Sequence, residues 1–126
     1  MLNAQDMILA CVAYFAVKHA IADYFLQTRY QWVNKGRYGH PGGLLHAAIH
    51  VAFSAPALLI LPPPSLNYGL SVLAAEFVVH YHTDWTKEQV VKRMGLTFAD
   101  NAFWRAMGVD QLVHGLTYVA MVKALA

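Results

Sequence analysis

The sequence predicts an all-α fold: a four-helix transmembrane bundle that forms one domain over residues 1–126. Hydrophobic residues make up 58% of the chain and charged residues only 13%, whereas soluble domains are roughly 25% charged. The hydrophobic residues also gather in four stretches, each near the ~20 residues that a helix needs to cross a bilayer. These stretches are residues 7–26, 44–61, 66–81 and 103–125. We find no extended alternation of apolar and polar residues, which would indicate strands.

The first predicted helix is capped by Asp6 and runs to about Arg29, because an acidic side chain before an apolar run can accept hydrogen bonds from free backbone N–H groups. Residues 30–43 contain four glycines and are predicted to form a loop. The second predicted helix begins at Leu44 and ends at the prolines of residues 62–64, which cannot donate backbone hydrogen bonds.

Proline and capping residues mark the remaining helix boundaries. Pro56 is expected to kink the second helix about one turn before it, because the proline ring crowds the carbonyl four residues earlier. Ser65 or Asn67 is placed to cap the third helix. This helix is expected to continue past the bilayer to Gly95, as a helical extension or interfacial segment before the fourth span. Asp100 is placed to cap the fourth helix.

The basic residues predict how the bundle is oriented. Most of them follow the first and third stretches: Arg29, Lys35, Arg37, Lys87, Lys92, Arg93 and Arg105. By the positive-inside rule both basic segments are cytoplasmic, so the helices run up-down-up-down in the bacterial inner membrane with both termini outward. The basic residues are too dispersed for nucleic-acid binding. The expected partners are membrane lipids, and the sequence is compatible with a homo-oligomer.

Each predicted helix carries two ionisable residues four positions apart, a spacing that places both side chains on one helix face. In an up-down-up-down bundle, the ends of the first and third helices lie beside the starts of the second and fourth. All four pairs are therefore expected to meet in one layer, roughly 5 to 15 Å inside the cytoplasmic interface. The pairs are His19/Asp23, His46/His50, His80/Asp84 and Asp110/His114.

These eight residues are predicted to bind a divalent metal, because histidine and carboxylate side chains are ligands for Zn, Mn and Fe. One zinc takes four ligands at most, so the set has room for two ions. Glu76 and Asp84 are the candidate catalytic residues, with Glu76 a ligand or a general base. His40 and His82 are excluded, because one lies in a loop and the other points off the shared face.

Four segments around these pairs carry a resemblance to a known family: residues 18–27, 46–50, 80–87 and 110–114. Over most of its length, the chain resembles an uncharacterised family of small bacterial and phage integral membrane proteins, a domain of unknown function. A looser likeness links it to inner-membrane metal-dependent hydrolases, which are also small, helical and rich in His and Asp. That likeness implies hydrolysis ahead of oxygenation but identifies no substrate.

The predicted function is metal-dependent hydrolysis of a phosphate or acyl ester at the membrane interface, acting on a lipid-like or phosphorylated substrate. Lys87 or Arg105 is placed to steady an anionic substrate. A proton- or ion-coupled transporter or membrane subunit is the first alternative, since buried His and Asp residues also carry protons. Three other interpretations remain: a His-rich di-iron oxygenase, a haem protein and a purely structural polar network.

Overall fold

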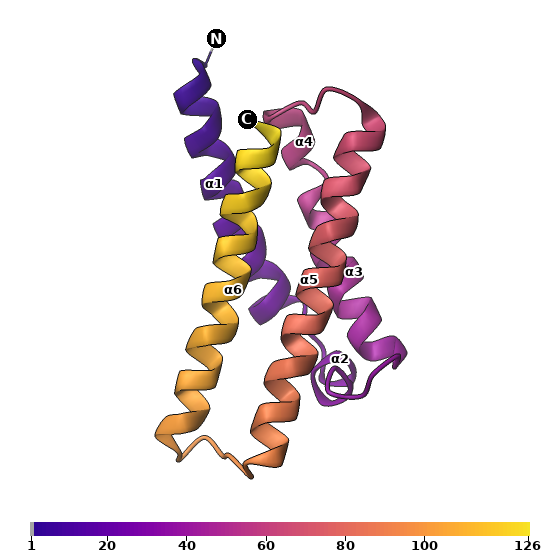
Figure 1. Ribbon diagram of the computed structural model, residues 1–126, viewed down its shortest axis with the longest axis vertical. Helices are drawn as coiled ribbons and strands as arrows, with labels where there is room; N and C mark the ends of the chain where they lie inside the picture. Colours follow the sequence, from indigo (N-terminus) through magenta and orange to yellow (C-terminus); the bar gives the residue numbers. More distant parts are fainter. Residues whose placement is uncertain (1) are drawn as a thin grey trace.

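The computed structural model describes residues 2–126, and within this range the chain forms helices and no strands (Figure 1). The all-α prediction is confirmed. The chain runs down, up, down and up again, so that both termini lie at one end of the bundle (Figure 1). The elements are α1 (Ala4–Ala20), the π-helix η1 (Ile21–Phe25), α2 (Arg29–Asn34), α3 (Pro41–Ser54), α4 (Ala57–Ile60), α5 (Leu66–Arg93) and α6 (Asn101–Leu125).

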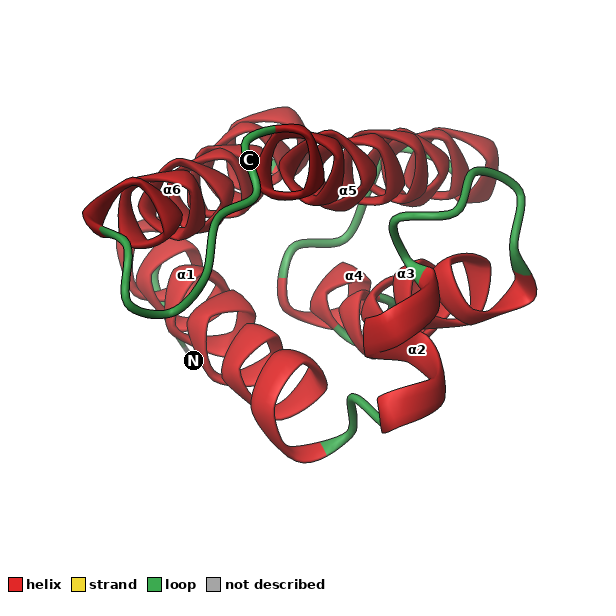
Figure 2. Cartoon of the chain, turned by 90° about the horizontal axis from the view of Figure 1, so that it is seen from below, coloured by secondary structure: helices red, strands yellow, loops and turns green. Residues whose placement is uncertain are grey.

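The four long helices surround a shared interior, as the view along the bundle shows (Figure 2). The two longest helices, α5 and α6, lie side by side, while α1 packs against α6 and α3 packs against α5. The short helix α2 packs against α3. Every long helix therefore turns one face toward the same interior, which is the arrangement that the four ionisable pairs require.

The interior is divided into an apolar half and a polar half. The apolar half lies at the end that holds both termini, where burial of hydrophobic side chains stabilises the bundle by roughly 1.5–3 kcal/mol for each large residue. Its buried residues are Cys11, Phe15, Ala57, Leu61, Leu73, Tyr118, Met121, Val122 and Leu125. The polar half lies nearer the other end and contains the ionisable pairs.

The first helix departs from its predicted boundaries. Asn3, and not Asp6, caps α1, because the Asn3 side chain accepts a hydrogen bond from the Asp6 N–H at 2.9 Å. The helix changes to η1 at Ile21 and ends well before Arg29. Thr28 then caps α2, so part of residues 30–43 is helical and the prediction of a continuous loop is wrong. The capping threonine competes locally with continuation of the first helix.

The second helix also begins earlier than predicted, at Pro41 instead of Leu44. Proline suits the first helical position because its missing N–H would have no partner there, and His40 Nδ1 accepts a hydrogen bond from the Gly42 N–H at 3.0 Å. Pro56 breaks the helix instead of kinking it one turn earlier: α3 ends at Ser54 and α4 starts immediately after the proline.

The predicted boundaries of α5 are confirmed. The Ser65 side chain caps its start by accepting from the Tyr68 N–H. Gly95, with a φ of +61°, follows its end, in a left-handed conformation that glycine adopts without strain. Asp100 immediately precedes α6, but its side chain makes no capping hydrogen bond to the helix. Its carboxylate accepts a hydrogen bond from the Thr97 N–H instead and stabilises the preceding turn.

Two segments are long and apolar enough to cross a membrane, Ala4–Phe25 and Pro41–Ile60. The sequence predicted four spans, so this expectation is met only in part. The helices α5 and α6 are long enough, but they carry polar residues such as Glu76, His80 and Asp110, which lower their average hydropathy. Those three side chains are buried inside the bundle.

Candidate metal centre

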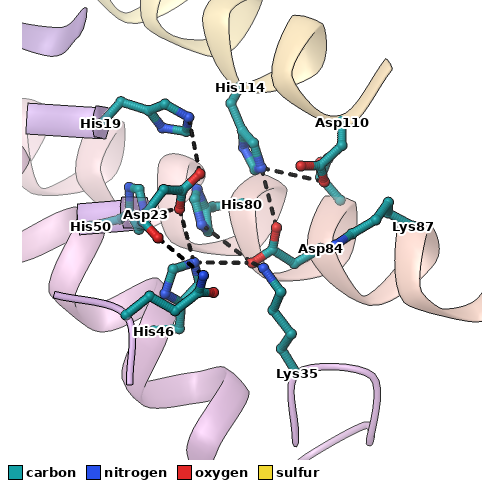
Figure 3. Close-up of polar contacts among 12 residues, drawn as sticks. His19, Asp23, Lys35, His46, His50, His80, Asp84, Lys87, Asp110 and His114 are labelled. Carbon is teal, nitrogen blue, oxygen red and sulfur yellow. Dashed lines mark hydrogen bonds and ion pairs between the residues drawn. The ribbon is translucent and has the colours of Figure 1, made fainter. Parts of the chain in front are cut away.

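All eight predicted ligands lie in one cluster between the four long helices (Figure 3). The pairs come from four directions: His19 and Asp23 from α1 and η1, His46 and His50 from α3, His80 and Asp84 from α5, and Asp110 and His114 from α6. Their spacing of four residues sets each pair on the inward face of its helix. His46 and His50 are completely buried.

Asp23, His46, His50 and His80 form the first group of converging ligand atoms, all within 4.8 Å of one another. His50 Nε2 lies 2.9 Å from Asp23 Oδ1, and His46 Nε2 lies 3.2 Å from the same oxygen. Ligands that bind one ion tetrahedrally at about 2.0–2.2 Å are roughly 3.3–3.6 Å apart. The observed separations are therefore close to those of a coordination shell.

His80, Asp84 and His114 form the second group, and His80 belongs to both. His114 Nε2 lies 3.2 Å from Asp84 Oδ1, and His80 Nε2 lies 3.6 Å from Asp84 Oδ2. His46 Nε2 reaches across from the first group to within 3.3 Å of Asp84 Oδ2. The two groups are thus adjacent, and either could hold a metal ion.

Several buried atoms in the cluster have no hydrogen-bond partner among the described residues: His46 Nδ1, His46 Nε2, His80 Nε2 and Asp110 Oδ1. The His46 Nε2 contacts with carboxylate oxygens are close, but they are not aligned as hydrogen bonds. A buried polar atom without a partner costs about 1–3 kcal/mol. A cation between these ring nitrogens and carboxylates would remove that cost for the atoms that bind it.

His19 lies in the cluster but outside both groups, because other side chains occupy its two ring nitrogens. Nε2 lies 2.9 Å from Gln111 Oε1 and 3.1 Å from Asp23 Oδ2, and Nδ1 lies 3.0 Å from the Tyr118 hydroxyl. Such outer contacts orient a ligating carboxylate and tune its basicity. In this geometry His19 holds Asp23 in place.

The widened turn of η1 sets the position of Asp23. Leu26 N–H bonds to Ile21 O at 3.0 Å, five residues back, and Asp23 lies inside this turn. Single π-helical turns are often found at functional sites because they re-aim the side chains they carry. Here the turn places Asp23 Oδ1 between His46 and His50 of the facing helix.

Asp110 and Glu76 also lie outside both groups. Asp110 Oδ1 is 3.6 Å from His114 Nε2, while its other oxygen accepts from Gln111 Nε2 at 3.1 Å. Glu76 is one turn deeper on α5, where its Oε1 accepts from Lys18 Nζ at 2.6 Å and from Ser54 Oγ at 2.8 Å. The charge of Glu76 is therefore paired with Lys18 and not with the cluster.

Two buried lysines, Lys18 and Lys35, lie in the polar half of the interior and are absent from the predicted ligand set. Lys18 stands one position before His19 in an apolar run, and a charge inside such a run is a signal that points to a role. The sequence predicts only a topological role for Lys35, yet its Nζ lies 3.4 Å from Asp84 Oδ2. Burial lowers the pKa of Lys35, but the carboxylates of Asp84 and Asp23 raise it by more, so the pKa stays above its ordinary value and the amine is cationic.

The two histidines that the sequence excluded have other contacts. His40 caps α3. His82 is exposed on α5, where its ring contacts the Val78 carbonyl and the Tyr38 hydroxyl.

A cavity of about 430 Å³ leads to the cluster from the end opposite the termini. The polar residues of its wall are Asp23, Gln27, Lys35, Lys87, Glu88, Thr97, Asp110 and Gln111. Its volume lies within the roughly 300–1,000 Å³ typical of small-molecule sites. The cluster is thus accessible to a ligand from this side.

Comparison with known proteins places the chain in a family. Residues 11–126 match the family described as "Protein of unknown function (DUF3307)". No curated protein and no solved structure matches the chain. The family match extends over all eight clustered residues, in keeping with the resemblance to an uncharacterised family. The chain belongs to this family of proteins of unknown function.

Proposed function

We propose that this protein is a divalent metal-dependent hydrolase of the bacterial inner membrane, cleaving a phosphate or acyl ester at the membrane interface. The observation that carries the proposal is the pair of adjacent ligand groups that share His80. Two ions about 3.5–4 Å apart can hold both the attacking and the leaving oxygen of a hydrolysis. The two groups share His80 and are joined by the 3.3 Å contact between His46 Nε2 and Asp84 Oδ2, so they are close enough for such a pair.

The side chains divide the chemical tasks among them. Zn, Mn or Fe bound here would lower the pKa of a coordinated water and polarise the ester. Asp84 contacts histidines of both groups and would hold a metal ion together with them. Asp110 Oδ1 is buried, has no hydrogen-bond partner among the described residues and belongs to a residue of the cavity wall, so it is placed to take a proton. Glu76 forms an ion pair with Lys18, one helical turn from His80 on the side toward the termini.

Two lysines of the cavity wall are placed to contact an anionic group of a substrate. Lys35 and Lys87 line the cavity beside the carboxylates of Asp23, Glu88 and Asp110, and the raised pKa keeps Lys35 protonated. A cation beside a reacting group stabilises charge that develops there. A phosphate ester, or the oxyanion formed from an acyl ester, meets this requirement.

We also propose that the protein is embedded in the membrane with four spans and both termini outward. Its side chains are distributed in support of this, with charged groups inside the bundle and large apolar groups on its surface. The charged groups of the cluster are buried, whereas large apolar side chains such as Leu9, Leu59 and Val109 are more than half exposed. A soluble protein rarely exposes apolar surface on this scale. Arg29 begins α2 and Arg93 ends α5. The helix α2 and this end of α5 lie away from the termini (Figure 1), on the side that the positive-inside rule assigns to the cytoplasm.

The apolar half of the interior favours a hydrolase over a transporter. A pathway for ions needs polar groups across the whole membrane. Beyond Glu76, the interior toward the termini is closed by apolar residues such as Phe15, Leu73 and Met121. The interior is therefore closed between the polar cluster and the end that holds the termini.

Metal content and ester hydrolysis of the purified protein test the proposal. Protein from metal-replete cells, purified without chelator, is expected to contain at least one Zn, Mn or Fe per chain by elemental analysis. It should hydrolyse bis(p-nitrophenyl) phosphate or p-nitrophenyl butyrate, and EDTA should abolish the reaction. Asp84→Asn should lose both properties, whereas Asp6→Asn, which changes an exposed carboxylate of α1, should keep them.

Folded parent protein without stoichiometric metal would overturn the proposal. Metal without hydrolysis, together with proton flux in proteoliposomes, would favour the transporter.

Cysteine labelling tests the orientation. In a Cys11→Ala background, Asn3→Cys and Arg37→Cys each introduce a single thiol at opposite ends of the bundle. A membrane-impermeant maleimide added to spheroplasts should label Asn3→Cys only. Labelling of Arg37→Cys alone would reverse the orientation, and labelling of both in intact spheroplasts would contradict membrane embedding.

A further inference from the structure

A second, larger cavity lies on the outer face of the bundle. It is a groove of about 720 Å³ between α5 and α6, beside the half of the bundle that contains the cluster. Its lining is mainly apolar and much of it is exposed, with Val109 and Met94 both about 60% accessible. Val78, Val79, Val90 and Val113 complete the apolar lining. A groove of this kind has the shape and chemistry for a hydrocarbon chain.

The groove adjoins the cavity that leads to the metal centre. Lys87, Leu96 and Asp110 line both hollows, so the groove and the cavity adjoin. Asp110 is in turn 3.6 Å from His114 of the second ligand group. A molecule lying in the groove therefore passes beside the candidate metal centre.

Two cationic side chains lie in this otherwise apolar groove. Arg105 is exposed there and makes no ion pair with any residue from 2 to 126. Lys87 is buried, with its Nζ 2.6 Å from Glu88 Oε1. A guanidinium without a carboxylate partner is a strong donor for a phosphate or carboxylate group.

We infer that the α5–α6 groove binds the acyl chain of an anionic lipid-like amphiphile, whose head group is held by Arg105 and Lys87 beside Asp110. The inference rests on the proposed function, since it names the substrate class of the same site. Hydrocarbon fits the valine-rich wall, and negative charge complements Arg105. Lys87 is already paired with Glu88, but its ammonium group has three N–H donors and can contact a head group as well. A second copy of this chain fits less well, because a symmetric contact would bring two sets of Arg105 and Lys87 together.

Competition between two lipids tests the inference. Protein in dodecyl maltoside, stripped of metal with EDTA, is mixed with equal amounts of dioleoyl-phosphatidylglycerol and dioleoyl-phosphatidylcholine, and bound lipids are counted by native mass spectrometry. The parent should prefer the anionic lipid. Arg105→Ala should lower this preference by about tenfold, the size of one lost charge-assisted contact. Arg29→Ala, which removes an arginine outside the groove, should leave the preference unchanged.

A second pair of variants tests the groove itself. Val109→Trp fills it and should reduce binding of both lipids. Val17→Trp changes a valine of matched exposure on α1, 59% against 60% for Val109, and should have no effect. Equal lipid binding by the two tryptophan variants would overturn the inference, as would an unchanged preference in Arg105→Ala. A parent dimer that Val109→Trp converts to monomer without changing lipid binding would identify the groove as a contact between copies and would also overturn it.

Metal content of the same preparations, measured before EDTA treatment, separates the two proposals. Lipid preference in a protein without metal would refute the hydrolase but support the groove. Bound metal without lipid preference would refute the groove and leave the hydrolase standing.

Discussion

His46 Nε2 on α3 lies 3.3 Å from Asp84 Oδ2 on α5, and this contact joins the two groups of converging ligand atoms. His46 also lies 3.2 Å from Asp23 Oδ1. One imidazole is therefore shared between carboxylates that come from two different helices. A change at this ring affects both groups, which makes it the most informative single position in the cluster.

His46→Ala is expected to remove most of the bound metal. The substitution deletes a ligand and leaves Asp23 and Asp84 buried with fewer partners. His82→Ala is the matched control, because this exposed histidine lies on the outside of α5. Elemental analysis of both variants, with circular dichroism to confirm the fold, checks the prediction. Equal metal content in folded His46→Ala and His82→Ala would show that the cluster is not a metal site.

His19→Ala is expected to weaken metal binding without abolishing it. Its ring orients Asp23 through the 3.1 Å contact and lies outside both ligand groups. Loss of such an outer contact typically lowers metal affinity 10–100-fold. A competition titration with a metal-chelating dye should show weaker binding at unchanged stoichiometry. Complete loss of one ion would identify His19 as a direct ligand instead.

Lys18→Met is expected to destabilise the bundle strongly. Lys18 and Glu76 are almost fully buried with their charged atoms 2.6 Å apart, and removal of one partner of a buried pair costs about 3–5 kcal/mol. The double variant Lys18→Met/Glu76→Gln should recover much of this loss because no lone charge remains. Lys123→Met, at the exposed end of α6, is the control.

Thermal unfolding in detergent measures the stability of these variants. A double variant no more stable than Lys18→Met alone would contradict the proposed pairing. A large loss in Lys123→Met would show that the assay responds to removal of any lysine.

Two helical glycines are expected to respond in opposite ways to alanine. A Cβ at Gly42 would lie 2.8 Å from the Tyr30 carbonyl and 2.9 Å from Asn34 Cβ, so Gly42→Ala should push α2 away from α3. A Cβ at Gly108 meets nothing within 4 Å, so Gly108→Ala should stabilise α6 by roughly 0.5–1 kcal/mol. Thermal unfolding of the two variants checks both directions. A stabilised Gly42→Ala would show that the α2–α3 contact is looser than the structure has it.

The sequence alone determined the helical class and which residues share a helix face. The hydrophobic stretches located the four long helices, and Ser65 and Gly95 correctly bounded α5. The spacing of His46 and His50 set both rings on one side of α3. These features are local: a spacing of four residues or a capping side chain acts on its own helix, whatever surrounds it.

The tertiary structure decided which of these faces meet and at which atoms. His19 and Asp110 share the inward faces of their helices, yet they lie outside both ligand groups. Gln111 and Tyr118 contact the ring nitrogens of His19, and Gln111 also donates to Asp110. The π-turn at Asp23 and the approach of Lys35 to Asp84 likewise depend on how separate helices pack. Sequence spacing fixes a side chain relative to its own helix axis, whereas the distances between helices follow from side-chain packing across the whole bundle.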